Sequence, residues 1–194
     1  MEFPMSSTAN AEVRPLTGST SSIFSQALWT AGFAVATALA ARVEIPHYPV
    51  PFTLQTMVVL LAGAFLGARN GALSQILYLA SGAVGLPVFA GGAFGFLKLV
   101  GPTGGYLLAF PLAAAIVGYL LRERRSPGFV TLSMAAGLLA IFTAGTIHLY
   151  AFSMGNASTA FSAGFLIFSW WDALKLGAAS MIYIELSKRW PKLG

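Results

Sequence analysis

Long apolar stretches, separated by short segments rich in polar residues, glycine or proline, form the main pattern along this chain. About twenty apolar residues cross a bilayer as a helix, and packed neighbours tolerate somewhat shorter spans. The pattern therefore predicts six membrane-spanning helices, over about Ile23–Ala41, Thr53–Gly67, Ala72–Ala83, Gly104–Leu121, Phe129–Ser153 and Phe161–Ser187. We expect an all-α integral membrane protein whose six-helix bundle forms one domain over residues 23–190.

The positively charged residues are distributed unevenly between the two ends of these helices. If both termini are cytoplasmic, the inner segments contain Arg14, Arg69, Arg122, Arg124, Arg125, Lys188, Arg189 and Lys192. Only Arg42 and Lys98 then lie in outer loops. Cytoplasmic loops of membrane proteins carry such an excess of Lys and Arg. The charges thus predict cytoplasmic N and C termini for a multi-pass protein of a bacterial inner membrane.

The polar segment over residues 1–22 precedes the first predicted helix. It lacks the charged start and the apolar core of a cleavable signal peptide. We therefore expect a flexible cytoplasmic segment there.

The composition supports the membrane assignment and excludes several functional classes. The chain is 57% hydrophobic and 9% charged, whereas soluble domains have about 25% charged residues. It has no cysteine, and His47 and His148 stand too far apart to form a metal-ligand motif, so neither a metal nor a cofactor is expected. The net charge of +5 is not arranged as a basic stripe, so nucleic acid is not an expected partner.

Two predicted outer loops have unusual compositions. Three prolines in Glu44–Phe52 rule out a regular helix there. The segment Gly82–Gly105 is rich in glycine yet apolar, unlike a solvated linker, and irregular backbone at membrane depth must be buried by protein or line a cavity. It lacks the phosphate-binding pattern Gly-x-x-x-x-Gly-Lys-Ser/Thr. We expect it to fold inward as an irregular cap between the third and fourth helices.

The last predicted helix contains a pair of charges, Asp172 and Lys175, after two tryptophans. Residues three apart share a helix face, and a charge at membrane depth is costly unless it is paired or faces a polar cavity. The residues alone allow a structural ion pair or a ligand site. Because the pair lies in the outer half of the bundle with the unusual loops, we favour a small-molecule pocket open to the outside.

Small residues mark two further helix faces. Gly63 and Gly67 form a Gly-xxx-Gly pair suited to close helix contact. In the first helix, small residues recur one turn apart at Ala27, Ala31, Ala34 and Ala38. This second pattern fits either packing inside the bundle or docking to another subunit.

Four motifs together resemble a known family. They are Val50-Pro-Phe-Thr-Leu-Gln-Thr56, Gly85-Leu-Pro-Val-Phe-Ala-Gly-Gly92, Gly101-Pro-Thr-Gly-Gly-Tyr106 and Asp172-x-x-Lys175. The chain resembles BioY, the biotin-specific substrate-binding (S) component of energy-coupling-factor (ECF) transporters, from the first helix to the sixth.

The resemblance implies high-affinity capture of biotin from outside and its uptake. It also implies a transmembrane coupling subunit of the EcfT or BioN type and ABC-type ATPases of the EcfA or BioM type, which hydrolyse ATP on behalf of the S component. Within the family the S component contacts the coupling subunit through the small-residue face of the first helix. That likeness favours docking at Ala34 and Ala38.

The resemblance also implies a binding site in which Asp172 and Lys175 contact biotin. Some relatives have an asparagine after the Gly91-Gly92 pair where this chain has Ala93. That polar contact is then missing, or is made by backbone N–H groups, Gln55 or Asn156. Apolar walls for biotin are expected from Phe52, Tyr78, Phe89, Tyr106 and Trp171.

Other functions remain open at this point. An S component for another vitamin would share the fold. A proton-coupled transporter would use Asp172 or Glu185 as its proton site. An intramembrane serine protease would need His148 as a base for Ser74 or Ser81, but no nucleophile-elbow motif is present. We therefore expect a transporter rather than an enzyme.

Overall fold

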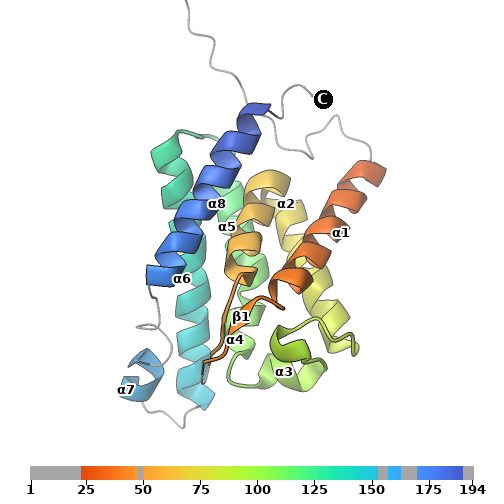
Figure 1. Ribbon diagram of the computed structural model, residues 1–194, viewed down its shortest axis with the longest axis vertical. Helices are drawn as coiled ribbons and strands as arrows, with labels where there is room; N and C mark the ends of the chain where they lie inside the picture. The colour runs from red at the N-terminus through yellow and green to blue at the C-terminus, as the bar shows by residue number, and fades with distance from the viewer. Residues whose placement is uncertain (1–22, 48–49, 153–156, 163–169, 190–194) are drawn as a thin grey trace, which may run out of the picture.

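The computed structural model describes residues 23–47, 50–152, 157–162 and 170–189. Its helices are α1 (Ile23–Ala40), α2 (Gln55–Ala83), α3 (Phe96–Val100), α4 (Gly104–Leu108), α5 (Phe110–Leu120), α6 (Pro127–Phe152), α7 (Ala157–Ala160) and α8 (Trp170–Arg189), with a 3₁₀ turn η1 (Ala90–Gly92). Figure 1 shows the long helices side by side, with the short elements gathered at one end.

Helix α2 is a hairpin of two antiparallel helices. Gly67 interrupts it with φ +76°, a backbone conformation that glycine adopts without steric cost. Gln55 Nε2 donates to the Tyr78 hydroxyl at 2.6 Å although 23 residues separate them, and a straight helix of that length would span about 35 Å. The second and third predicted helices are thereby confirmed. Their turn lies at Gly67, not at Arg69–Gly71 as expected.

The fourth predicted helix is also interrupted. It consists of α4 and α5, which meet at Ala109. Pro111 stands in the first turn of α5 and has no N–H to donate to the preceding turn. The last predicted helix corresponds to α8, which begins at Trp170, and residues 163–169 before it lie outside the described residues. With these boundaries, the predicted six-helix bundle is confirmed.

The start of α1, the Gly67 turn and the end of α8 lie at one end of the bundle. Asn70, just after the Gly67 turn, donates to Gln26 Oε1 near the start of α1 at 3.2 Å. Figure 1 shows the start of α1 and the end of α8 at this same end, and the strands, α3 and α4 at the other. Which end faces the cytoplasm stays a prediction.

The outer surface of the bundle is strongly apolar. Leu28, Leu39, Leu132 and Met181, from α1, α6 and α8, are 62–72% exposed. By length and composition α1, α2 and α6 could each cross a membrane, although α2 is folded into a hairpin at Gly67. Large exposed apolar areas are rare on soluble monomers, whereas lipid tails can solvate such areas on a membrane protein.

The core lies where α2, α5 and α6 meet. Leu60, Val117, Met134 and Leu138 are at most 2% exposed there. A Cβ atom placed on Gly63 would overlap the Ala114 carbonyl oxygen of α5. Gly63 therefore allows the close helix crossing that the Gly-xxx-Gly pattern predicted.

We expect Gly63→Val to destabilise the protein by about 1–3 kcal/mol, the usual cost of overpacking a close-packed interior. The added side chain must push α5 away from α2. Thermal unfolding of the detergent-solubilised protein measures the effect. Gly177→Val is the matched control, because a Cβ atom at Gly177 meets nothing within 4 Å. Equal stability of the two variants would contradict this account of the crossing.

Candidate functional site

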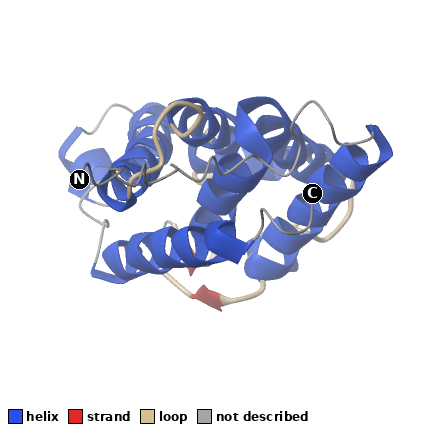
Figure 2. Ribbon diagram, turned by 90° about the horizontal axis from the view of Figure 1, so that it is seen from above, coloured by secondary structure: helices blue, strands red, loops and turns tan. Residues whose placement is uncertain are grey.

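A short antiparallel hairpin precedes α2. Its strands β1 (Glu44–Ile45) and β2 (Phe52–Thr53) pair Glu44 with Thr53 and Ile45 with Phe52. The prolines between them excluded a helix as expected, but the pairing itself was not predicted. Figure 2 shows the strands at the edge of the helix bundle.

The glycine-rich segment folds inward as the predicted cap. Phe89 is fully buried and packs edge-on against Tyr78, with ring centroids 5.6 Å apart. A Cβ atom on Gly82 would overlap the Phe89 ring, so only glycine leaves room for this anchor. The Gly95 N–H also donates to the Gly82 carbonyl at 2.8 Å. Near the hairpin, the Arg42 guanidinium donates to the Pro87 carbonyl of the cap.

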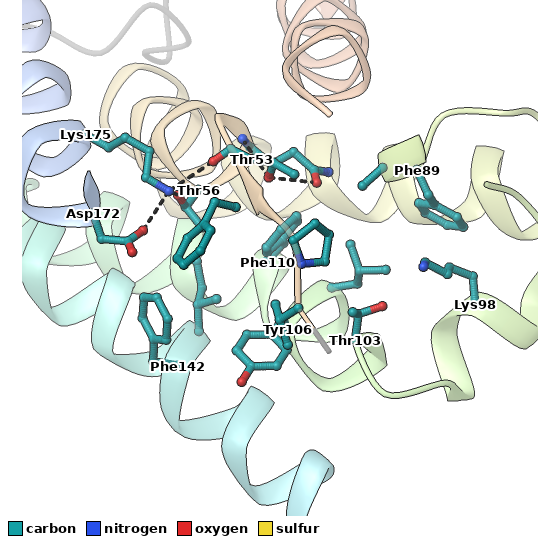
Figure 3. Close-up of a pocket in the computed structure, with 17 residues that line it drawn as sticks. Thr53, Thr56, Phe89, Lys98, Thr103, Tyr106, Phe110, Phe142, Asp172 and Lys175 are labelled. Atoms are coloured by element: carbon teal, nitrogen blue, oxygen red, sulfur yellow. Dashed lines mark hydrogen bonds and ion pairs between the residues drawn. The ribbon is translucent and has the colours of Figure 1, made fainter. Parts of the chain in front are cut away.

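A pocket lies between the cap, the hairpin, α4, the middle of α6 and the start of α8 (Figure 3). Its free space, including the open mouth, is about 670 Å³. Its lining residues are Val50, Pro51, Phe52, Thr53, Gln55, Thr56, Phe89, Ala90, Lys98, Thr103, Tyr106, Leu107, Phe110, Ile141, Phe142, Asp172 and Lys175. The walls are mainly apolar, with polar groups at separate points.

The predicted pair Asp172–Lys175 forms one of these polar points. The two residues are 2% and 5% exposed, and Lys175 Nζ lies 2.6 Å from Asp172 Oδ1. The ammonium also donates to the Thr53 carbonyl at 3.0 Å and to Thr56 Oγ1 at 2.9 Å. Because an ammonium has three donors, these contacts saturate Lys175. The pair therefore joins α8 to the start of α2 and at the same time forms part of the pocket wall.

Several other predicted residues also line the pocket. Phe52, Phe89 and Tyr106 supply aromatic surface, and Gln55 supplies an amide. The Gln55 amide donates to Tyr78 and accepts from Thr53 Oγ1 at 3.1 Å. Its orientation in the wall is therefore fixed before any ligand arrives.

The remaining predicted binding residues do not line the pocket. Tyr78 lies behind Gln55 and supports it. Gly91, Gly92 and Ala93 belong to the cap, but only the neighbouring Ala90 reaches the wall. Gly91 and Gly92 instead lie next to the Glu44 and Arg42 side chains.

Two further residues, Trp171 and Asn156, were predicted to contact the ligand. Trp171 is half-buried on α8 and is absent from the lining. Asn156, which was considered beside Gln55 as a replacement for the polar contact missing at Ala93, lies outside the described residues.

The small-residue face of α1 is only partly turned toward the bundle, since Ala27 at its start is exposed. Ala34 is 6% exposed, and Ala38 packs against the buried core. The exposed side of α1 includes the larger residues Leu28, Val35 and Leu39. The geometry matches the packing alternative, and docking through Ala34 and Ala38 stays a prediction.

Sequence reasoning missed six residues that matter in the pocket: Thr53, Thr56, Lys98, Thr103, Phe110 and Phe142. Thr53, Thr56 and Thr103 stand inside motifs that had been singled out, but their hydroxyls were not considered. Lys98 was treated only as an outer-loop charge, although a lone cation in an apolar cap is itself a signal. Phe110 and Phe142 look like any apolar helix residue.

The residues considered for the other functions make separate structural contacts. His148 Nε2 lies 2.9 Å from the Gly101 carbonyl and so joins α6 to the cap. Ser74 and Ser81 donate to the carbonyls of Gly71 and Tyr78, so neither is paired with His148. Glu185 is paired with Lys188 at 3.1 Å on the exposed surface of α8.

Comparison with known proteins gives a consistent result. The model of the BioY family matches residues 9–192. The biotin transporter BioY of Thermotoga maritima is 42% identical over 148 residues, covering 76% of this chain and 87% of that protein. The probable biotin transporter BioY of Pyrococcus horikoshii is 40% identical over 150 residues, covering 77% and 88%.

A solved structure is similar as well. It is the S-component for biotin from an ECF-type ABC transporter, with a TM-score of 0.78 and 25% identity. The match covers 85% of this chain and 92% of that one. The similarity therefore extends over the whole bundle and not over one motif.

Proposed function

Because this chain belongs to the BioY family, we propose that it captures biotin from the external side of the membrane and mediates its uptake as the S component of an ECF transporter. Biotin uptake is the function that its relatives and its structural neighbour support. The chain is a membrane transport component and not an enzyme. The observation that carries the proposal for the site is the largely apolar pocket with a buried Asp172–Lys175 pair in its wall.

The chemistry of biotin suits this pocket. Biotin has a neutral ureido ring with two N–H donors and one carbonyl, a thioether ring, a chain of methylenes and a terminal carboxylate. Aromatic walls from Phe52, Phe89 and Tyr106 provide apolar surface for the rings and the chain. The Asp172 carboxylate can accept from ureido N–H groups, and such charge-assisted hydrogen bonds are strong.

The transport cycle requires partners. A fixed pocket under a cap binds a ligand but supplies no energy for its release. We propose that a transmembrane coupling subunit and ABC-type ATPases, of the types named above, release biotin inward by hydrolysing ATP. In this arrangement the pocket end faces outward, and the end with Arg69, Arg122 and Lys188 lies in the cytoplasm of a bacterial inner membrane.

Biotin binding to the purified protein in detergent tests the proposal. We expect calorimetry to show tight, saturable binding at one site, and no comparable binding of other vitamins. A folded parent protein that binds another vitamin in preference to biotin would favour an S component of different specificity. Absence of any biotin binding would overturn the proposal.

Uptake into cells tests the partners. We expect accumulation of labelled biotin to require the coupling subunit and a hydrolysis-competent ATPase. Uptake that persists without ATPase partners but collapses with the proton gradient would instead favour a proton-coupled transporter.

A further inference from the structure

His148 on α6 is a titratable residue for which the proposed transport function has no role so far. Its imidazole is half-buried, and its Nε2 atom lies 2.9 Å from the Gly101 carbonyl oxygen. The same oxygen accepts a hydrogen bond from the Gly104 N–H at 2.9 Å, which closes a turn just before α4. A carbonyl oxygen has no proton to donate, so Nε2 carries the hydrogen in this contact. His148 therefore holds the turn from the side of α6.

Two glycines next to this turn leave the space in which the imidazole lies. A Cβ atom on Gly105 would overlap the Cβ and Cγ atoms of His148. A Cβ atom on Gly104 would overlap the Leu99 carbonyl and lie 3.4 Å from Nε2 of His148. Neither glycine has a positive φ, so the close approach of α6, and not the backbone conformation, requires glycine here. The glycine pair of the sequence motif and His148 thus form one packing unit.

The same face of α6 also holds Tyr106. A Cβ atom on Gly145 would overlap the Tyr106 ring, and Phe142 packs edge-on against that ring with centroids 6.2 Å apart. Phe142, Gly145 and His148 are spaced three residues apart and therefore share one face of the helix. Tyr106 lines the pocket. This face of α6 consequently sets where the segment Gly101–Tyr106 lies, and His148 supplies a polar contact to it.

We propose that His148 is a positioning residue for ligand binding. Its hydrogen bond to the Gly101 carbonyl fixes the turn before α4 and so places Tyr106 in the pocket wall. His148 is not among the residues that line the pocket, so it acts through Tyr106 and not on the ligand. A wall that is already ordered binds more tightly, because less ordering is needed when the ligand arrives. This inference rests on the proposed function, since the ligand concerned is biotin.

A purely structural role for His148 predicts a different result. Without the imidazole, the Gly101 carbonyl still accepts from the Gly104 N–H. The loss of stability is then that of an ordinary hydrogen bond and not that of a buried acceptor left without a partner. A structural His148 would change the unfolding temperature and leave the affinity of the folded protein unaltered. A positioning His148 changes the affinity.

The test compares two amides at position 148 in the full chain, solubilised in detergent. His148→Gln places an amide nitrogen near the position of Nε2, whereas His148→Asn is one methylene shorter and does not reach the carbonyl. By calorimetry we expect His148→Gln to keep the biotin affinity within about twofold. His148→Asn and His148→Leu should lose about 3- to 10-fold, the effect of one neutral hydrogen bond. Labelled biotin should dissociate faster by a similar factor.

The matched control is Ser133→Ala. The Ser133 hydroxyl is buried in the same helix, donates to the Phe129 carbonyl and is absent from the pocket lining. Its removal should leave the biotin affinity unchanged. Combining His148→Asn with Tyr106→Leu tests the route. If His148 acts through Tyr106, the added His148→Asn change should weaken binding by less than about twofold further, because residues that act through one contact are not additive.

The outcomes separate this inference from the proposed function. Equal biotin affinity of the His148→Gln and His148→Asn proteins would overturn the inference, whether both match the parent or both are weak. Full additivity of His148→Asn with Tyr106→Leu would overturn it as well. In these cases biotin binding by the parent still supports the proposed function. If the folded parent does not bind biotin, the proposed function fails and this inference fails with it.

Discussion

Replacing Asp172 with asparagine should weaken biotin binding by about 2–5 kcal/mol, because truncating one member of a buried charge pair leaves the other without its counter-charge. Asparagine has nearly the same shape as aspartate. It nevertheless puts an amide with lower acceptor strength where the carboxylate faces the ligand. Lys175, only 5% exposed, would keep its positive charge without a compensating one. Calorimetry with the detergent-solubilised protein measures the change.

The matched control for Asp172→Asn is Glu185→Gln, which removes the acid of the exposed pair on the same helix. Exposed pairs contribute about 0–1 kcal/mol, so this variant should bind biotin like the parent. Unchanged binding by a stable Asp172→Asn protein would show that the buried pair only holds α8 against α2.

The double variant Asp172→Asn/Lys175→Met separates the structural role from the ligand role. It removes the uncompensated charge that either single change leaves buried, so we expect it to recover stability relative to Asp172→Asn. Biotin binding should not recover, because the ureido acceptor is still missing. Thermal unfolding and calorimetry on the same samples distinguish the two quantities.

The sequence predicted the features that follow from hydrophobicity and charge cost. The apolar stretches located the helices, since a spanning segment must satisfy its backbone internally. The Asp172–Lys175 pair was recognised because charges in an apolar helix are energetically costly unless they are paired or face a polar cavity. The inward cap was predicted because its glycine-rich sequence is too apolar for a solvated loop.

Features that depend on packing between distant segments could not be predicted from hydrophobicity and charge along the sequence. Glycine at 67, rather than the polar Arg69–Gly71, makes the turn because a positive φ is decisive there. Tyr78 was expected in the pocket wall, but it is absent from the lining, and its hydroxyl accepts a hydrogen bond from the lining residue Gln55. The distinction between a wall residue and its support depends on the tertiary contact, which no local pattern encodes.

Chemical role was equally hard to assign for common residue types. Thr56 accounts for one of the three acceptors that saturate Lys175. A threonine near a helix start has many local uses, so its sequence position alone does not reveal this one. Lys98 became informative only when its side chain proved to line the pocket.

The cap should be as important to binding as the ion pair, and Gly82→Leu tests this. A side chain at position 82 would occupy the place of the Phe89 ring, so Phe89 must leave its buried position. Losing the burial of a phenylalanine costs about 3–5 kcal/mol. Because the cap supplies Phe89, Ala90 and Lys98 to the pocket, we expect biotin affinity to fall at least about tenfold along with the loss of preorganisation.

Gly32→Leu is the control for this change, since Gly32 lies on the exposed side of α1 and a Cβ atom there meets nothing within 4 Å. That variant should match the parent in both thermal stability and biotin affinity. Phe89→Ala separates the two effects of Gly82→Leu, because it removes the anchor without adding volume at position 82. If both cap variants bind biotin as tightly as the parent does, the ligand is held by α8 and the hairpin alone. The cap would then stabilise the fold without forming the site.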